Sequence, residues 1–184
     1  MAKNQLIKPK KNKKNKKSGQ KGLTVVYQYD IIAIQRKKGV FCEMAGRSFM
    51  HQLDSKNRMR MPAKLREVLG DGYYITVGTG GCLSVFTEEQ MQVVKATLQK
   101  VNAFREDQQK VARFILYNTW QAEEDKQGRI LIPENLRKYA KIEKNMIVVE
   151  GPQCVEIWSE ESWNEYFKDI NFNCLADALD ALNK

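Results

Sequence analysis

Residues 54–66 read DSKNRMRMPAKLR, and residues 125–137 read DKQGRILIPENLR. At this offset of 71 residues, the two segments share an aspartate, an arginine, a proline and a Leu-Arg pair at matching positions. One residue is then inserted, and CLSVFTEE (82–89) matches CVEIWSEE (154–161) at an offset of 72. Matches of type and spacing over this length indicate an internal tandem repeat. We therefore predict that one small folding unit occurs twice in the chain.

The repeated segment has the pattern of a β-hairpin followed by a short helix. A strand leads into the pentapeptide DSKNR or DKQGR, and a strand with buried and exposed positions in alternation follows it. The fourth position of the pentapeptide is Asn57 in one copy and Gly128 in the other. These residue types best tolerate the positive φ that a tight or bulged turn requires. We expect Asp54 and Asp125 to orient the two turns.

Further elements complete each unit. Pro62 and Pro133 stand where a helix can begin, because the first turn of a helix does not use the N–H that proline lacks. The first unit is predicted to contain strands at 48–53, 59–61, 73–77 and 83–86 and a helix at 63–69. The second is predicted to contain strands at 130–132, 146–149 and 155–158 and a helix at 134–140.

Helices are predicted to flank both units. Residues 87–90 form a capping-box pattern, and a helix from there to about 101 would place its apolar residues on one face. A second helix is expected at 104–117, and a terminal one would carry Phe172, Leu175, Leu179 and Leu182. These apolar stripes are interpreted as core or subunit packing. The expected organisation is an extension at 1–43, repeats at 48–90 and 119–162, connecting helices at 91–118 and C-terminal helices at 163–184.

The positive charge of the chain is concentrated at its N-terminus. Residues 1–43 hold 12 of the 31 basic and 2 of the 22 acidic residues, so the remaining residues are close to neutral. The lysine- and asparagine-rich run at 8–21 has almost nothing apolar to pack and is expected to be disordered. Binding of nucleic acid by the folded repeats must therefore depend on where individual charges lie.

Three interpretations of residues 1–43 stay open. The segment could be an arm that grips phosphates without sequence preference, or a solvated tail of no specific purpose. It could also be a translated leader, with Met44 as the natural start. An abundant peptide from within 1–43 in the native protein would exclude the third interpretation.

The sequence lacks the residues that several classes of function need. The four cysteines are scattered and His51 is the only histidine, which argues against a metal site or a Cys–His or Ser-His-Asp catalytic centre. Gly78–Gly81 suits a turn between strands better than a phosphate-binding loop. We expect no catalytic residues, no metal and no cofactor. With no apolar run of roughly 18–20 residues and no secretory signal, the chain is expected to be soluble and intracellular.

DSKNRMRMPAKLRE (54–67), DKQGRILIPENLRK (125–138) and the duplication together resemble the MraZ family, bacterial regulators with two SpoVT-AbrB domains in one chain. The likeness covers Met44 to the C-terminus. It implies an α+β fold in which two tandem SpoVT-AbrB-like β-hairpin/helix repeats form a swapped-hairpin β-barrel with flanking helices. It also implies ring-shaped homo-oligomers, a place at the nucleoid in the cytoplasm, and binding to direct repeats in double-stranded DNA upstream of the chain's own cell-division and cell-wall operon.

Arg58 and Arg129 are the first candidates for DNA contact, because both repeats keep an arginine beside the turn and the family resemblance supports this role. An arginine there can reach phosphates or guanine edges. In the alternative interpretation each arginine forms an ion pair with the aspartate of its own turn, and both interpretations can hold together. The second group of candidates, each of which could equally be a solvated surface charge, is Lys56, Arg60, Lys64, Arg66, Lys126, Arg137 and Lys138. Arg66 and Arg137 rank highest among them, because they match the basic position that follows leucine in the short helix of the resembled family.

Two rival functions stay open beside sequence-specific transcriptional regulation. The lysine-rich tail could bind RNA or the ribosome, and deletion of residues 1–43 would then abolish binding. The chain could instead be an assembly scaffold that binds another protein, in which case any DNA binding would lack the strong salt dependence of phosphate contacts.

Overall fold

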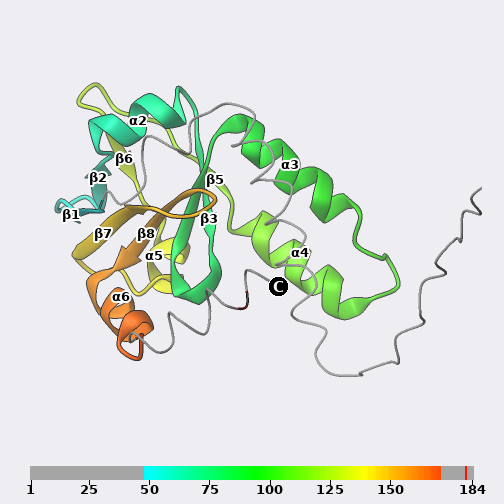
Figure 1. Cartoon of the computed structure of the whole chain (residues 1–184). Coiled ribbons are helices and arrows are strands. Elements are labelled where there is room, and N and C mark those ends of the chain that lie inside the picture. The colour runs from blue at the N-terminus through cyan, green and yellow to red at the C-terminus, as the bar shows by residue number, and fades with distance from the viewer. Residues whose placement is uncertain (1–47, 171–180, 182–184) are drawn as a thin grey trace, which may run out of the picture.

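The computed structural model describes residues 48–170 and residue 181. Two tandem units follow one another along the chain in an α+β arrangement (Figure 1). The first contains β1 (Ser48–Gln52), β2 (Arg58–Arg60), α2 (Ala63–Leu69), β3 (Tyr74–Val77) and β4 (Leu83–Phe86). After α3 (Glu88–Gln99) and α4 (Glu106–Tyr117), the second contains β5 (Trp120–Gln121), β6 (Arg129–Leu131), α5 (Glu134–Tyr139), β7 (Asn145–Glu150), β8 (Val155–Ser159) and α6 (Glu160–Phe167).

The strands of the two units are exchanged. β1 of the first unit pairs with β7 of the second, and β5 of the second unit pairs with β3 of the first. The resulting antiparallel sheet has six strands in the order β1-β7-β8-β4-β3-β5. β2 and β6 pair with each other as a separate two-stranded ladder, which we call the β2–β6 ribbon. Each unit therefore completes its sheet with a strand of the other.

The predicted closed barrel is wrong, because the two sheets are not joined into one. β1 and β5 stand at opposite edges of the six-stranded sheet. The β2–β6 ribbon contains only three residue pairs, from Arg58 with Leu131 to Arg60 with Arg129. Pro62 and Pro133 follow closely after its strands, and proline cannot donate to a ladder. The ribbon therefore ends before it can bridge the sheet edges.

The core lies between the six-stranded sheet and the ribbon. Met59 and Ile130, at the centre of the ribbon, are fully buried, as are Leu65 of α2 and Leu136 of α5. These side chains pack with Ile75, Leu83, Val148 and Ile157 from one face of the sheet. Burial of this apolar surface is the main force that holds the exchanged strands together.

Helices cover the other face of the sheet, which we call its outer face. α3 and α4 lie together beside β3 and β4, whereas α6 lies apart from them near β7 and β8 (Figure 1). The capping box predicted before α3 is present, since the Thr87 hydroxyl accepts from the Gln90 N–H at 3.2 Å and the Gln90 side chain accepts from the Thr87 N–H at 2.9 Å. Met91, Val94 and Leu98 of α3 are buried as its periodicity predicts.

Most element bounds lie within two residues of their predicted positions. α2 and β4 match, β2 begins at Arg58 rather than at residue 59, and α4 begins at Glu106 rather than at residue 104. The predicted extension at 1–43 and the terminal apolar stripe from Phe172 to Leu182 lie outside the described residues. Among the residues that the structure describes, no helix is long and apolar enough to cross a membrane.

Candidate nucleic-acid interface

The two predicted turns have the same backbone hydrogen bonds. In the first, the N–H groups of Lys56 and Arg58 donate to Asp54 Oδ1 at 2.8 and 2.9 Å. In the second, the N–H groups of Gln127 and Arg129 donate to Asp125 Oδ1 at 2.9 and 3.0 Å. Each aspartate thus accepts two backbone N–H groups of its own turn.

The fourth position of each turn has the backbone conformation that the sequence predicts. Asn57 has a φ of 58° and Gly128 a φ of 69°. This left-handed region is open to glycine and is tolerated by asparagine better than by most other residues. The two turns are therefore equivalent in backbone conformation as well as in hydrogen bonding.

Pairing of β2 with β6 brings the two aspartates and two arginines into one cluster, which we call the Asp–Arg quartet. Arg58 donates to Asp54 Oδ2 through Nε at 2.9 Å and Nη2 at 2.7 Å, and to Asp125 Oδ2 through Nη1 at 3.1 Å. Arg129 donates to Asp125 Oδ2 through Nε at 2.8 Å and lies 3.8 Å from Asp54 Oδ2. The quartet links the repeats across the ribbon, and its formal charge is zero.

The quartet keeps its carboxylates ionised to low pH. The Arg58 side chain, followed by the Arg58 backbone N–H, lowers the pKa of Asp54 to about 2. The Arg129 side chain and backbone lower the pKa of Asp125 in the same way. Hydrogen bonds to the charged form of a carboxylate have this effect. At neutral pH each guanidinium therefore faces a full negative charge.

The exposed face of the ribbon is rich in arginine. Arg58, Arg60, Arg129 and Leu131 alternate with the buried Met59 and Ile130, so these four side chains share the outward side of the two strands. The pairing register sets Arg60 opposite Arg129, and Leu131 opposite Arg58. Arg60 is exposed and forms no ion pair with another residue of the described chain. This face therefore carries a cation that the quartet does not neutralise.

The other predicted candidates fall into two groups. Lys56 and Lys126 are exposed at the turns and Lys64 is exposed on α2. Three candidates are engaged elsewhere: Arg66 pairs with Glu124 at 3.2 Å, Arg137 donates to the Ile132 carbonyl at 3.1 Å, and Lys138 pairs with Glu134 at 2.6 Å. The strand candidates thus share the outward side of the ribbon, whereas Arg66, Arg137 and Lys138 are held by other residues.

Comparison with known proteins identifies the duplicated unit. The family model of the MraZ protein matches residues 44–114 and, a second time, residues 115–183. The chain belongs to the MraZ family. The resemblance predicted from the two hairpin segments is confirmed, and so is the presence of two repeats.

Relatives in the MraZ family match over most of their length. The transcriptional regulator MraZ of Thermoanaerobacter sp. (strain X514) is 42% identical over 137 residues, which is 73% of this chain and 96% of the relative. The regulator of Caldanaerobacter subterraneus subsp. tengcongensis is 41% identical over the same shares. That of Clostridium beijerinckii is 38% identical over 135 residues, 73% of this chain and 95% of the relative. MraZ proteins are transcriptional regulators, which implies DNA binding and gene regulation. The family is not a family of enzymes.

Sequence reasoning missed two residues of this MraZ surface. Glu124 binds Arg66 and also accepts from the Tyr73 hydroxyl at 3.3 Å. Its counterpart in the first repeat is Leu53, so comparison of the repeats gave no reason to select it. Leu131 is the counterpart of Arg60 and is 45% exposed. That mismatch is visible in the two repeated segments and could have been used to find it.

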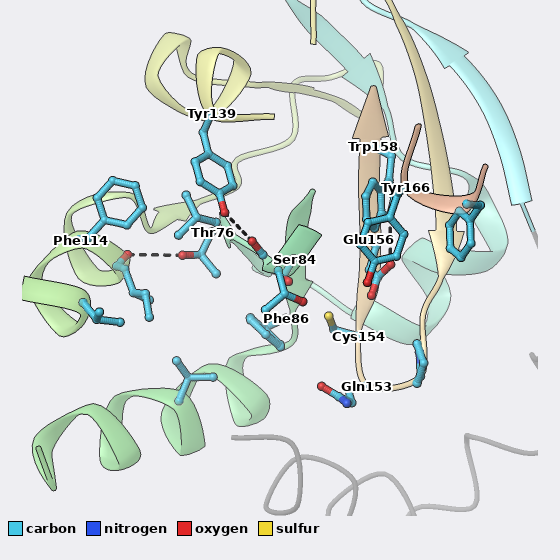
Figure 2. A pocket seen from close by; sticks show the side chains of 18 residues that line it. Thr76, Ser84, Phe86, Phe114, Tyr139, Gln153, Cys154, Glu156, Trp158 and Tyr166 are labelled. Atoms are coloured by element: carbon cyan, nitrogen blue, oxygen red, sulfur yellow. Dashed lines mark hydrogen bonds between the residues drawn. The ribbon is translucent and has the colours of Figure 1, made fainter. Parts of the chain in front are cut away.

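A second candidate region of the chain is a pocket of about 580 Å³ on the outer face of the sheet. Figure 2 shows Thr76, Phe114 and Tyr139 on one side of it, Glu156, Trp158 and Tyr166 on the other, and Ser84 between them. The Tyr139 hydroxyl donates to the Gly78 carbonyl at 2.6 Å. The Trp158 Nε1–H donates to Glu156 Oε2 at 2.9 Å. Both contacts hold polar side chains in the pocket wall.

The chemistry of the pocket differs from that of the ribbon. Among the described residues, no lysine, arginine or histidine lines it, so it is unsuited to a polyanion. Burial raises the pKa of the Cys82 thiol and raises that of Cys154 to about 12, so neither is a thiolate nucleophile at neutral pH. Within the part of the chain that the structure describes, no three His, Cys, Asp or Glu residues are grouped to hold a metal.

Proposed function

We propose that this MraZ-family chain regulates transcription by binding direct repeats in double-stranded DNA upstream of its own cell-division and cell-wall operon, with the β2–β6 ribbon as its contact surface. The observation that carries the proposal is the outward side of the ribbon, where Arg58, Arg60 and Arg129 lie together. A two-stranded ribbon fits the major groove of DNA, and arginine is the commonest reader of guanine there.

Arg58 and Arg129 can serve the turn and DNA at once. A guanidinium has five N–H donors, and the contacts of Arg58 direct three of them at Asp54 and Asp125. The side chain of Arg58 is 23% exposed and that of Arg129 is 29% exposed. The carboxylates hold each guanidinium in one orientation, so that its free N–H groups can meet a phosphate or a guanine without further ordering. Asp54, Asn57, Asp125 and Gly128 support this function by holding the turns.

Other cations add attraction without this orientation. Arg60, Lys56 and Lys126 are exposed around the same surface, and Lys64 is exposed on α2 beside it. Arg60 stands opposite Arg129 in the ribbon, and like charges directly opposite each other repel. A phosphate bound between them would relieve that repulsion. Arg66, Arg137 and Lys138 would first have to leave their partners, so we assign them a smaller share.

The two ends of the ribbon also carry different side chains, which suits DNA boxes that all run in the same direction. Arg60 of the first repeat corresponds to Leu131 of the second, while Arg58 and Arg129 correspond to each other. A perfectly two-fold ribbon would read both orientations of a box equally. Arginine at one end favours guanine and leucine at the other favours the thymine methyl group. A reader of this kind distinguishes a box from its inverse, as direct repeats require.

We further propose that the chain acts as a ring-shaped homo-oligomer at the nucleoid in the cytoplasm. A ring offers several ribbons to several boxes and raises the effective concentration of each, which a folded body of nearly neutral charge needs. Leu116 and Tyr117 at the end of α4 and Phe104 before it are large, apolar and exposed. Exposed apolar groups of this kind are typical of protein contacts.

Footprinting on the DNA immediately upstream of the chain's gene tests the proposal. We expect protection of several boxes with the same orientation and spacing, lost in Arg58→Ala/Arg129→Ala. A ladder of protection without preferred boxes would contradict it.

RNA or ribosome binding by the lysine-rich tail is the second candidate, because residues 1–43 carry most of the excess positive charge. Deletion of residues 1–43 separates the two functions. Tail-driven binding to RNA would disappear, whereas box-specific protection by the ribbon would persist.

A further inference from the structure

Glu156 is a carboxylate without a cationic partner among the described residues. It is half-buried on β8 in the wall of the outer-face pocket. Its one hydrogen bond comes from the Trp158 Nε1–H at 2.9 Å, and no lysine, arginine or histidine of the described chain pairs with it. Burial raises its pKa. A carboxylate withdrawn from water without a cation is costly and often marks a binding site.

Comparison of the repeats shows that only the second repeat carries this carboxylate. Ser84 occupies the corresponding position of the first repeat and lies directly opposite Glu156 in the sheet. Gly151 leaves room for the acid, since a Cβ there would come within 2.6 Å of Glu156 Cδ and Oε1. The second repeat therefore places an acid where the first has a small hydroxyl, and the neighbouring loop accommodates it.

Aromatic side chains form the walls around Glu156. The rings of Trp158 and Tyr166 have centroids 4.9 Å apart, and Phe86 and Phe114 line the opposite part of the pocket (Figure 2). The faces of aromatic rings attract cations, and several rings with a carboxylate are a common receptor for ammonium groups. The pocket volume of about 580 Å³ lies within the range of small-molecule sites.

We infer that this pocket binds a small organic ammonium compound, with its cation at Glu156 and its apolar part against the aromatic walls. A phosphate or carboxylate ligand would meet a negative charge with no described cation to offset it. A metal ion would find one carboxylate, and divalent ions need several ligands. An organic ammonium satisfies both the carboxylate and the rings. This site goes beyond the proposed DNA contact, and no ribbon residue lines it.

The test uses the full-length chain labelled with 5-fluorotryptophan and observed by fluorine NMR. Trp158 reports on the site, because its indole N–H is bonded to Glu156, and Trp158→Phe assigns its signal. Phenethylamine is titrated against 2-phenylethanol, a neutral molecule of nearly the same shape. We expect both to shift the Trp158 signal, with the amine binding at least about tenfold more tightly because only it carries a charge.

Two variants locate the preference for the amine. Glu156→Gln keeps the size of the side chain and should equalise the affinities of amine and alcohol. Glu161→Gln removes an exposed carboxylate of α6 and should leave the tenfold preference intact. Equal affinities in the wild type, or an amine preference that survives Glu156→Gln, would overturn the inference.

A cation from elsewhere in this chain is the competing source of the ammonium group. In that case the amine would cause no saturable shift of the Trp158 signal in the wild type. That result would also overturn the inference of an external ligand. DNA protection is measured on the same variants, and since the ribbon lies outside the pocket, either proposal can fail without the other.

Discussion

The two repeats are nearly identical where they hold the backbone and different where they meet the surroundings. Both turns use an aspartate that accepts two backbone N–H groups and an arginine that closes over it. In contrast, Arg60 corresponds to the exposed Leu131, and Ser84 corresponds to the half-buried Glu156. The two repeats thus share one scaffold, and they differ in the side chains that they present at the ribbon and in the pocket.

The largest expected effect is the loss of DNA affinity when the arginine that both repeats keep beside the turn is removed. Arg58→Ala/Arg129→Ala should weaken binding to the upstream boxes by at least about 30-fold, because each lost arginine contact to a base is worth roughly 1–3 kcal/mol. Gel shift with box and scrambled DNA measures the loss. The oligomeric state measured by analytical ultracentrifugation should stay unchanged, since the aspartates still bind the turn backbone.

Two controls accompany that double variant. Lys64→Ala removes one exposed charge near the ribbon and should reduce affinity for both DNAs alike. Arg58→Lys/Arg129→Lys keeps the charge but loses the geometry of the guanidinium, so box preference should fall more than total affinity. Full box binding by the alanine double variant would remove the assigned role of these arginines.

Truncation of equivalent core residues in the two repeats should lower the free energy of unfolding by equal amounts. Met59 and Ile130 face each other at the centre of the ribbon and are 1% and 0% exposed. Truncation of either to alanine should lower the free energy of unfolding by roughly 2–5 kcal/mol, through lost burial and the cavity left behind. Denaturant titration measures it. A large difference between Met59→Ala and Ile130→Ala would show that the two repeats do not share this core equally.

Much of this comparison could be predicted from the sequence, because it depends on local geometry. The turn type follows from Asn57 and Gly128 alone, and the helix starts follow from the two prolines. The exchange of β1 and β5 and the absence of barrel closure depend on how distant strands meet, which a local pattern does not encode. The same holds for the Asp–Arg quartet: an ion pair within each turn is one of the two interpretations that the sequence leaves open, but the contact of Arg58 with Asp125 arises only when the ribbon forms.

Exchanging the unlike residues tests whether the ribbon gives DNA binding a direction. Arg60→Leu/Leu131→Arg keeps the net charge and changes two exposed positions. We expect the preferred orientation of a single asymmetric box to invert, with a change of about tenfold in relative affinity, since one arginine contact discriminates by roughly 1–3 kcal/mol. Competition between a box and its inverse measures the ratio. An unchanged preference would show that direction comes from other residues.

The turn conformation allows a smaller and cleaner comparison. Gly128→Ala should cost about 1–2 kcal/mol of stability, because alanine resists the left-handed region that this position adopts. Gly128→Asn installs the residue of the first repeat and should cost less. Both substitutions bring a Cβ to within 2.5 Å of Arg66 Nη1, so this contact cancels in the difference between them. Equal melting temperatures of the two variants would contradict the equivalence of the turns.

The smallest expected effect is the contribution of the quartet carboxylates to the loss of folding stability in acid. The pKa of Asp54 is lowered from 3.8 to about 2 by the Arg58 side chain and backbone. A carboxyl group with a depressed folded-state pKa stabilises the fold above its unfolded pKa, and this stabilisation is lost as the pH falls through the folded value. Stability should therefore decline between about pH 4 and pH 2 in the wild type.

Asp54→Asn/Asp125→Asn should start less stable at pH 7 and decline less over that interval, whereas the matched exposed variant Asp71→Asn should follow the wild type. If the double variant declined as steeply as the wild type, the acid sensitivity would belong to carboxylates outside the ribbon, and the quartet would hold the arginines in place without contributing to the pH dependence of folding.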